Sequence, residues 1–228
     1  MTIAHTLLQI DHVSASSTVQ IAAKRVGSSW AWYIIRGAGF TAAAMLILLM
    51  LSGIGQVTGL TYRFIEPVKA WMVHKALAFA LCAAIILHVT FLFFDHYVSF
   101  SLVQVMVPFV SHYNNGTKLF GVPLAGLGVT LGILAAYGVA IIVLTSLGWI
   151  DSKKGTWRLL HYLSYFVMFF VFLHALYTGS DLKYGIFRAV WIFLIFVVLL
   201  AIISRLGRAG TLSNTAVKAD KLAPRNSV

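Results

Sequence analysis

Four histidines lie inside or at the edge of two long apolar stretches of the chain, where an imidazole is the side chain best suited to chemistry. His74 and His88 belong to one stretch, and His161 and His174 belong to another. An ionisable group surrounded by lipid is costly, so it is by default a candidate functional residue. Neutral imidazole can serve there as an axial ligand of heme iron, as a hydrogen-bonded packing residue or as part of a proton relay.

The composition predicts an integral membrane protein. Of the 228 residues, 60% are hydrophobic and 10% are charged, with a mean hydropathy of +0.91. Uncharged stretches long enough to cross a hydrocarbon core of about 30 Å occur four times, and a fifth is shorter but is extended by apolar residues and by arginines that can snorkel. These stretches are 37–62, 76–94, 119–150, 159–180 and 189–204. We therefore expect an all-α bundle of about five transmembrane helices.

The spacing of the histidines indicates two sites at different depths. One crossing separates the second and fourth stretches, so they run in the same direction, and His74 is expected level with His161 and His88 level with His174. Fourteen helical residues advance about 21 Å and return to within about 40° of the starting direction, so His74 and His88 share a face. Thirteen residues leave His161 and His174 about 140° apart, which requires a bend or cofactors that approach from different sides.

Structural or proton-relay histidines are the alternative to heme ligation. A relay would normally recruit carboxylates, and the predicted spans contain none. Two histidine pairs at matched depths therefore favour two hemes. The single cysteine, Cys82, cannot form a disulfide within this chain or a thiolate metal site on its own.

Two segments carry a family resemblance. "HKALAFALCAAIILH" (74–88) and "WRLLHYLSYFVMFFVFLH" (157–174) resemble the ferric reductase-like transmembrane domain. That superfamily includes the membrane parts of NADPH oxidases and ferric reductases and the heme subunit of a bacterial methionine sulfoxide reductase system. "FDHYVSFSLVQVMVPFVSHY", "AYGVAIIVLTS" and "HALYTGSD" are similar to its small bacterial members that have no fused dehydrogenase. The resemblance covers roughly residues 32–205.

The resemblance implies two heme b groups with bis-histidine ligation. His74 and His161 would hold the cytoplasmic-side heme, and His88 and His174 the outer heme. It also implies a place beside the outer heme for Arg36, which could instead be a snorkelling anchor. Further neighbours are expected at the inner heme, although the tryptophan could be an interfacial belt residue: Lys75, Trp157 and Arg158.

Three regions are expected along the chain. Residues 1–29 are predicted to be a polar or interfacial tail, residues 30–206 the diheme transmembrane domain, and residues 207–228 a disordered basic tail. Residues 98–113, interrupted by Pro108, are expected to form a re-entrant or interfacial segment. Gly128 and Gly132, four positions apart, permit close helix contact.

The net charge of +11 is attributed to membrane topology rather than to nucleic-acid binding, because the cations lie at span ends and in the tails. The larger group predicts the cytoplasmic side, which places the N-terminus outside and the C-terminus in the cytoplasm. That group is Arg63, Lys69, Lys75, Lys153, Lys154, Arg158, Arg205, Arg208, Lys218, Lys221 and Arg225; the opposite group is Lys24, Arg25, Arg36, Lys118, Lys183 and Arg188.

The expected function is transfer of electrons across a membrane by an oxidoreductase subunit. We expect it to need a separate reductase partner, because the chain has no nucleotide- or flavin-binding motif. A cytoplasmic flavoprotein or membrane quinol would be the donor, and an acceptor would lie at the outer surface of a bacterial cytoplasmic membrane. His96, His112 and Asp181 were candidates for an acceptor or metal site there. The alternatives are a heme-bearing assembly or anchor subunit and a heme-free scaffold or transporter.

Overall fold

The computed structural model describes residues 3–96 and 98–222, with side chains described from residue 29 to residue 207 apart from residue 97. Within these residues, five helical segments are long and apolar enough to cross a membrane. They are Ser29–Val57, Pro67–Leu92, Ala125–Gly148, Lys154–Thr178 and Ile186–Gly207. The prediction of a helical integral membrane protein with five spans is confirmed, although one short two-stranded sheet is also present.

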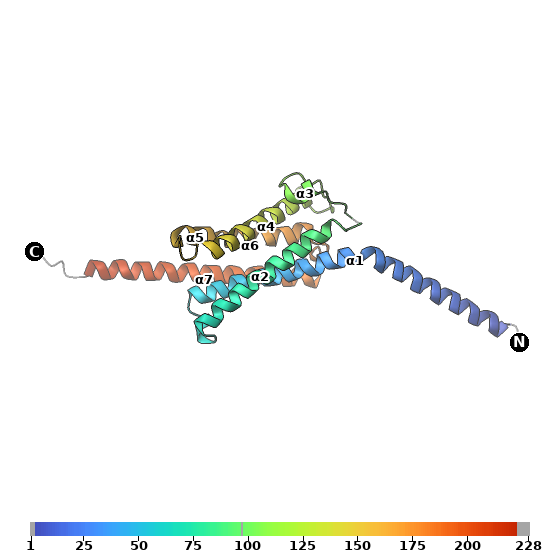
Figure 1. The fold of residues 1–228 in the computed structure, drawn as a ribbon, viewed down its shortest axis with the longest axis horizontal. Helices are drawn as coiled ribbons and strands as arrows, with labels where there is room; N and C mark the ends of the chain where they lie inside the picture. Colours follow the sequence, from blue (N-terminus) through green and yellow to red (C-terminus); the bar gives the residue numbers. More distant parts are fainter. Residues whose placement is uncertain (1–2, 97, 223–228) are drawn as a thin grey trace, which may run out of the picture.

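The spans belong to the long helices in Figure 1. These are α1 (Ile3–Val57), α2 (Pro67–Leu92), α4 (Ala125–Gly148), α5 (Lys154–His161), α6 (Leu163–Thr178) and α7 (Ile186–Leu222). The shorter elements are η1 (Thr61–Arg63), α3 (Leu102–Met106), β1 (Lys118–Leu119), β2 (Val122–Pro123) and η2 (Ser180–Leu182). The first part of α1 and the last part of α7 extend beyond the bundle at opposite ends (Figure 1).

The two predicted tails are largely helical in backbone. α1 begins at Ile3 and α7 continues to Leu222, whereas the sequence favoured a polar tail over 1–29 and disorder over 207–228. Extending an existing helix is far easier than nucleating one, and the segment after residue 207 contains Ala, Leu and Lys, which are good helix formers. The domain boundaries at 29 and 207 stay predictions.

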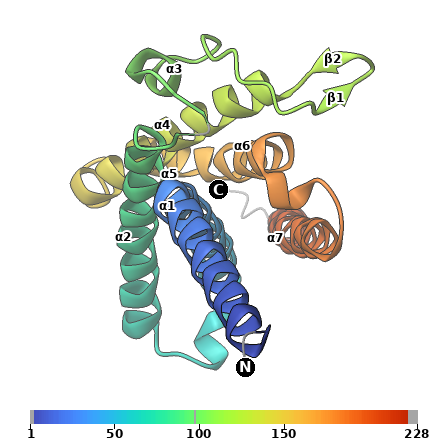
Figure 2. The same cartoon turned by 90° about the vertical axis from the view of Figure 1, so that its right-hand side faces the viewer.

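Two helix hairpins build the bundle. α1 packs along α2, α4 packs along α6, and α7 lies beside α1, whereas the backbones of α2 and α6 stay apart (Figure 2). Side chains from α1, α2, α4, α6 and α7 meet in the core, where the most deeply buried large residues are Leu81, Met168 and Val198. The space between the hairpins is therefore left for side chains and for anything that they bind.

Glycines on α4 allow α6 to approach closely. A Cβ added at Gly128 would lie 2.8 Å from Tyr177 Cβ and from Thr178 Cγ2, and one added at Gly138 would lie 2.5 Å from Val167 Cγ2. These distances are shorter than ordinary van der Waals contact. The expected close contact at Gly128 and Gly132 is confirmed, and Gly138 extends it towards the other end of α4.

The fourth span changes its winding directly after His161. The α-helical pattern is interrupted at Tyr162, whose N–H is shared between Arg158 O (3.3 Å) and Leu159 O (3.2 Å), and Tyr165 N–H bonds to Tyr162 O at 3.2 Å. Bonds to the third preceding residue tighten a helix to about 120° per residue instead of about 100°. The tighter winding of this turn rotates His174 towards the direction of His161. Such a change in the helix is one of the two possibilities that the thirteen-residue spacing left open.

Residues 98–113 form a capped single turn and an extended segment at one end of α4. The side chain of Ser101 accepts a hydrogen bond from Gln104 N–H, and the Gln104 side chain accepts from Ser101 N–H. Phe109 N–H donates to Thr130 Oγ1 (3.0 Å), and Tyr137 Oη donates to Met106 O (2.5 Å). The segment is tied to α4 and is not a sixth span, while its depth in the membrane stays a prediction.

We expect Gly138→Leu to destabilise the bundle, because the new side chain would overlap Val167 on α6. Overpacking of this kind costs about 1–3 kcal/mol, which would appear as a lower thermal unfolding midpoint in detergent. Gly148→Leu is the matched control, since a Cβ at Gly148 meets nothing within 4 Å. Equal midpoints for the two variants would contradict the close approach of α4 and α6.

Candidate functional site

The four histidines face one another in two pairs across the space between the hairpins. The ring centroids of His74 and His161 lie 6.4 Å apart, and those of His88 and His174 lie 6.3 Å apart. Each pair joins α2 to the other hairpin, through α5 in one case and α6 in the other. The pairing predicted from matched depths is the pairing in the structure.

At the His88–His174 pair, both imidazoles bond to main-chain carbonyls. His88 Nδ1 lies 2.9 Å from Ile35 O on α1, and His174 Nδ1 lies 2.8 Å from Gly128 O on α4. A carbonyl can only accept, so Nδ1 must carry the hydrogen in each ring. The lone pair is then on Nε2, which is the tautomer that a metal-ligating histidine adopts when a backbone carbonyl orients it.

The same local arrangement allows both of these bonds. In a helix, the carbonyl of residue i already accepts from the N–H of residue i+4, and a second donor must approach past that residue. Here residue i+4 is Gly39 for Ile35 and Gly132 for Gly128. A Cβ at Gly39 would lie 3.2 Å from His88 Nδ1, and one at Gly132 would lie 2.6 Å from His174 Nδ1. The glycines therefore open the carbonyls to the imidazoles.

His74 has a side-chain partner instead. Its Nδ1 lies 2.8 Å from Ser52 Oγ, and Ser52 Oγ donates its only hydrogen to Leu49 O at 2.9 Å. The hydroxyl must then accept from His74 Nδ1–H, which again leaves Nε2 with the free lone pair. Gly53 provides the room, since a Cβ there would lie 3.3 Å from His74 Cε1.

His161 differs from the other three histidines. Its Nδ1 is buried and has no hydrogen-bond partner within the described part of the chain. Its ring packs instead on Trp157, with centroids 5.2 Å apart. Leaving a buried polar atom unpaired costs about 1–3 kcal/mol. The orientation of the His161 ring therefore depends on packing, including its contact with Trp157, and not on a hydrogen bond of Nδ1.

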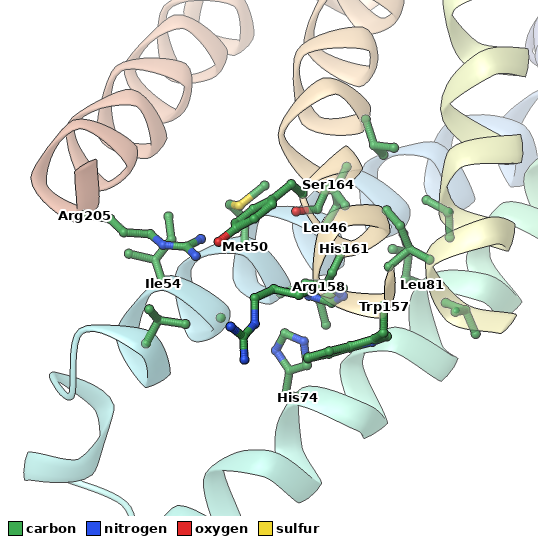
Figure 3. Close-up of a pocket in the computed structure, with 18 residues that line it drawn as sticks. Leu46, Met50, Ile54, His74, Leu81, Trp157, Arg158, His161, Ser164 and Arg205 are labelled. Atoms are coloured by element: carbon green, nitrogen blue, oxygen red, sulfur yellow. The ribbon is translucent and has the colours of Figure 1, made fainter. Parts of the chain in front are cut away.

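A cavity of about 450 Å³ lies at the His74–His161 pair (Figure 3). Its walls are mostly apolar side chains from α1, α2, α4 and α6, among them Leu46, Met50, Leu81 and Val167. This volume is within the range of pockets that bind cofactors and drug-sized ligands. The polar lining residues are His74, Ser164, Trp157, Arg158, His161, Tyr162 and Arg205.

Two guanidinium groups reach the cavity, Arg158 from α5 and Arg205 from α7 (Figure 3). The ion pairs in the described residues are Arg36–Asp181 and Lys69–Glu66, so neither cavity arginine has a carboxylate partner there. Arg205 donates to Tyr165 Oη and lies 5.5 Å from the ring centroids of Tyr162 and Tyr165. Unpaired arginines beside an apolar cavity suit an anionic group on a ligand.

These residues fit a heme. A transition metal bound at about 2 Å from each of two opposed imidazole nitrogens holds the ring centres roughly 6 Å apart, as both pairs do. The described residues contain no cluster of three or more His, Cys, Asp or Glu. Each histidine pair could supply two imidazole nitrogens to a heme iron. The apolar walls suit its ring, and the arginines suit its propionates.

Of the three other predicted neighbours of the inner heme, two line the cavity and one does not. Trp157 and Arg158 line the cavity, and Trp157 Nε1–H also donates to Ser146 Oγ at 3.1 Å, which fixes the indole. Lys75 is not among the lining residues; its Nζ lies 4.4 Å from the ring centroid of Trp71. The role of Lys75 at a heme stays a prediction.

Arg36 directly follows Ile35, the residue whose carbonyl binds His88. It forms an ion pair with Asp181 and lies 3.9 Å from the ring centroid of Trp32. Both charged side chains are partly buried. The sequence placed Arg36 near the outer site without identifying Asp181 as its partner.

Tyr113 lies in the segment between α3 and β1. Burial, and after it the charge of Asp95, raises the pKa of Tyr113 above its ordinary value, so this side chain stays protonated at neutral pH. Asp181 is engaged by Arg36. The suggestion that His96, His112 and Asp181 form one site gains no support from the described contacts.

Sequence reasoning missed the residues that orient the imidazoles. One signal was present: Gly39 and Gly53 are separated by fourteen residues, as His74 and His88 are, which suits two antiparallel helices in register. A main-chain acceptor cannot be recognised from the sequence, because every residue has a carbonyl. Arg205 was predicted only to lie at the end of a span. The missed residues are Ile35, Gly39, Ser52, Gly53 and Arg205. The pairing of Asp181 with Arg36 was also missed.

Fold and site together define a class of protein: a five-span membrane bundle with two stacked pairs of opposed imidazoles. Residues 38–172 match the family model described as "Ferric reductase like transmembrane component". The match covers more than half of the chain, so this protein belongs to that family. It includes His74, His88 and His161, and His174 follows two residues after its end. A search of curated proteins found no match.

We expect Arg36 and Asp181 to be energetically coupled. In a double-mutant cycle with Arg36→Gln and Asp181→Asn, the partly buried pair should show a coupling energy of about 1 kcal/mol that decreases at high salt. Unfolding in detergent would measure it. The exposed Lys69–Glu66 pair is the control and should show almost none, and equal coupling in both pairs would contradict the assignment.

Proposed function

We propose that this protein is a diheme b-type cytochrome subunit that carries electrons across a membrane. Membership of the ferric reductase-like family supports a membrane electron-transfer role. The observation that carries the proposal is the hydrogen bonding of the histidines, since three of the four have Nδ1 engaged and Nε2 free. Packing histidines have no reason to keep Nε2 lone pairs opposed in two pairs, whereas metal ligands require it.

The residues of the chain have distinct roles in this proposal. His74 and His161 would ligate the inner heme, and His88 and His174 the outer heme. Bound heme supplies a change of one electron between ferric and ferrous iron. Apolar side chains exclude water, and Arg158 and Arg205 would bind propionates at the inner site. Arg36, which is paired with Asp181, would lie beside the outer heme. Trp157 would pack against the inner cofactor.

The proposed donor is a separate cytoplasmic flavoprotein or membrane quinol, and the proposed acceptor lies at the outer surface. The charge bias of the loops supports an outside N-terminus and a cytoplasmic C-terminus. Lys153, Lys154 and Arg158 are close in sequence at the predicted cytoplasmic end and could attract an acidic partner.

We expect the purified protein to contain two heme b per chain. After dithionite reduction, its absorbance should show b-type Soret and α bands, and pyridine hemochrome analysis should give the stoichiometry. His88→Leu and His174→Leu should each remove the outer heme and halve the heme content. His74→Leu and His161→Leu should do the same at the inner site.

His96→Leu and His112→Leu are matched controls outside the helices and should keep both hemes. A wild-type protein that folds without b-type bands would overturn the proposal in favour of a heme-free scaffold or transporter. Bound heme that neither a quinol nor a flavoprotein reduces would favour the assembly or anchor subunit instead.

We also expect labelling to place the α4–α5 turn in the cytoplasm. In a Cys82→Ala background, Ser152→Cys should react with a membrane-impermeant maleimide only after the membrane is opened, in cells or right-side-out vesicles. Asn114→Cys, at the other end of α4, should react without opening. The reverse pattern would show that the predicted orientation is wrong and that the His74–His161 pair lies on the outer side.

A further inference from the structure

The two histidine pairs have different hydrogen-bond acceptors. At the His88–His174 pair, both Nδ1–H groups donate to main-chain carbonyls. At the His74–His161 pair, one donates to the Ser52 hydroxyl and the other has no partner within the described residues. Donation from Nδ1–H to a strong acceptor makes an imidazole a more basic ligand. The His88–His174 pair is therefore the more electron-rich of the two.

Ligand basicity acts on the reduction potential of the bound iron. A more basic ligand stabilises the ferric state more than the ferrous state, so it lowers the potential. On this ground alone, the iron at the His74–His161 pair should be the easier one to reduce. The absent acceptor at His161 and the shared hydroxyl at His74 contribute in the same direction.

Fixed charge is a second and independent difference. Arg158 and Arg205 line the cavity at His74 and His161, and within the described residues no carboxylate pairs with either. Near the other pair, the charge of Arg36 is balanced by Asp181. Positive charge in a low-dielectric site favours the ferrous iron, which carries one positive charge fewer. This effect also raises the potential at the His74–His161 pair.

We propose that the His74–His161 site has the higher reduction potential, so that the first electron taken up by the protein resides there. This inference rests on the proposed diheme function. One electron converts one ferric iron to ferrous, and no ligand or proton needs to move. The inner site would then store an electron until an acceptor draws it through the outer site, which is the more strongly reducing of the two.

The test is a potentiometric titration of the purified holoprotein with dithionite and ferricyanide, followed at the α band. The wild-type protein should show two one-electron waves. His88→Leu should keep the wave at the higher potential, and His74→Leu should keep the wave at the lower potential. The opposite assignment would overturn the inference.

Two further variants test the physical causes. Ser52→Ala removes the acceptor of His74 and should shift only the higher wave upward. Arg205→Gln removes a positive charge and should shift only the higher wave downward, while Arg205→Lys keeps it near its wild-type position. Movement of the lower wave instead of the higher one in both Ser52→Ala and Arg205→Gln would contradict the proposed origin of the difference.

Matched controls separate these effects from general disturbance. Thr41 is also on α1 and donates its hydroxyl to a main-chain carbonyl without touching a histidine, so Thr41→Ala should shift neither wave. Lys153→Gln removes an exposed charge that packs on Trp149 and should also leave both in place. Absence of b-type bands would remove the proposed function itself, whereas two waves in the reversed order would remove only this inference.

Discussion

An imidazole among apolar side chains is stabilised when its N–H donates to an acceptor, as three of the four histidines do here, and this interaction shapes the bundle. The acceptors at hand in a lipid-embedded helix are carbonyls that already serve the helix itself. His88 and His174 share such carbonyls, which demands that α1 approach α2, and α4 approach α6, closely enough for a ring to reach the main chain. Glycines at the contact make this approach sterically possible.

The architecture follows from meeting that demand twice. In each hairpin one helix accepts hydrogen bonds from imidazoles of the other: α1 accepts from His74 and His88 of α2, and α4 accepts from His174 of α6. His161 on α5 has no such acceptor within the described residues. Apposing the two hairpins brings the rings of each pair opposite each other, while the backbones of α2 and α6 stay apart. Helix association without a hydrophobic driving force depends on such close packing and on interhelical hydrogen bonds. The same contacts therefore hold the fold and prepare the site.

Much of this could be predicted from the sequence, because apolar length and histidine spacing are properties of residue type. The five spans followed from apolar length, and the pairing of His74 with His161 and of His88 with His174 followed from helix geometry. Helix geometry also offered a bend as one of two possibilities for the fourth span. The cause of the bend could not be predicted, since the sharing of Tyr162 N–H between two carbonyls is set by tertiary packing. The roles of the Ile35 and Gly128 carbonyls could not be predicted either, because every residue has a carbonyl and only the folded structure shows which ones accept from a histidine. Ser52 and Arg205 were recognisable only once the folded chain brought them to the histidines.

The choice between main-chain and side-chain acceptors bears on how the protein can evolve. An amino-acid substitution cannot remove a main-chain carbonyl. The hydrogen bonds that orient His88 and His174 should therefore survive substitutions at Ile35, as long as Gly39 and Gly132 remain small. Ser52 is different, since a single substitution such as Ser52→Ala removes the hydroxyl that His74 uses. Natural variation in imidazole basicity should therefore accumulate at the His74–His161 pair, while the His88–His174 pair stays invariant.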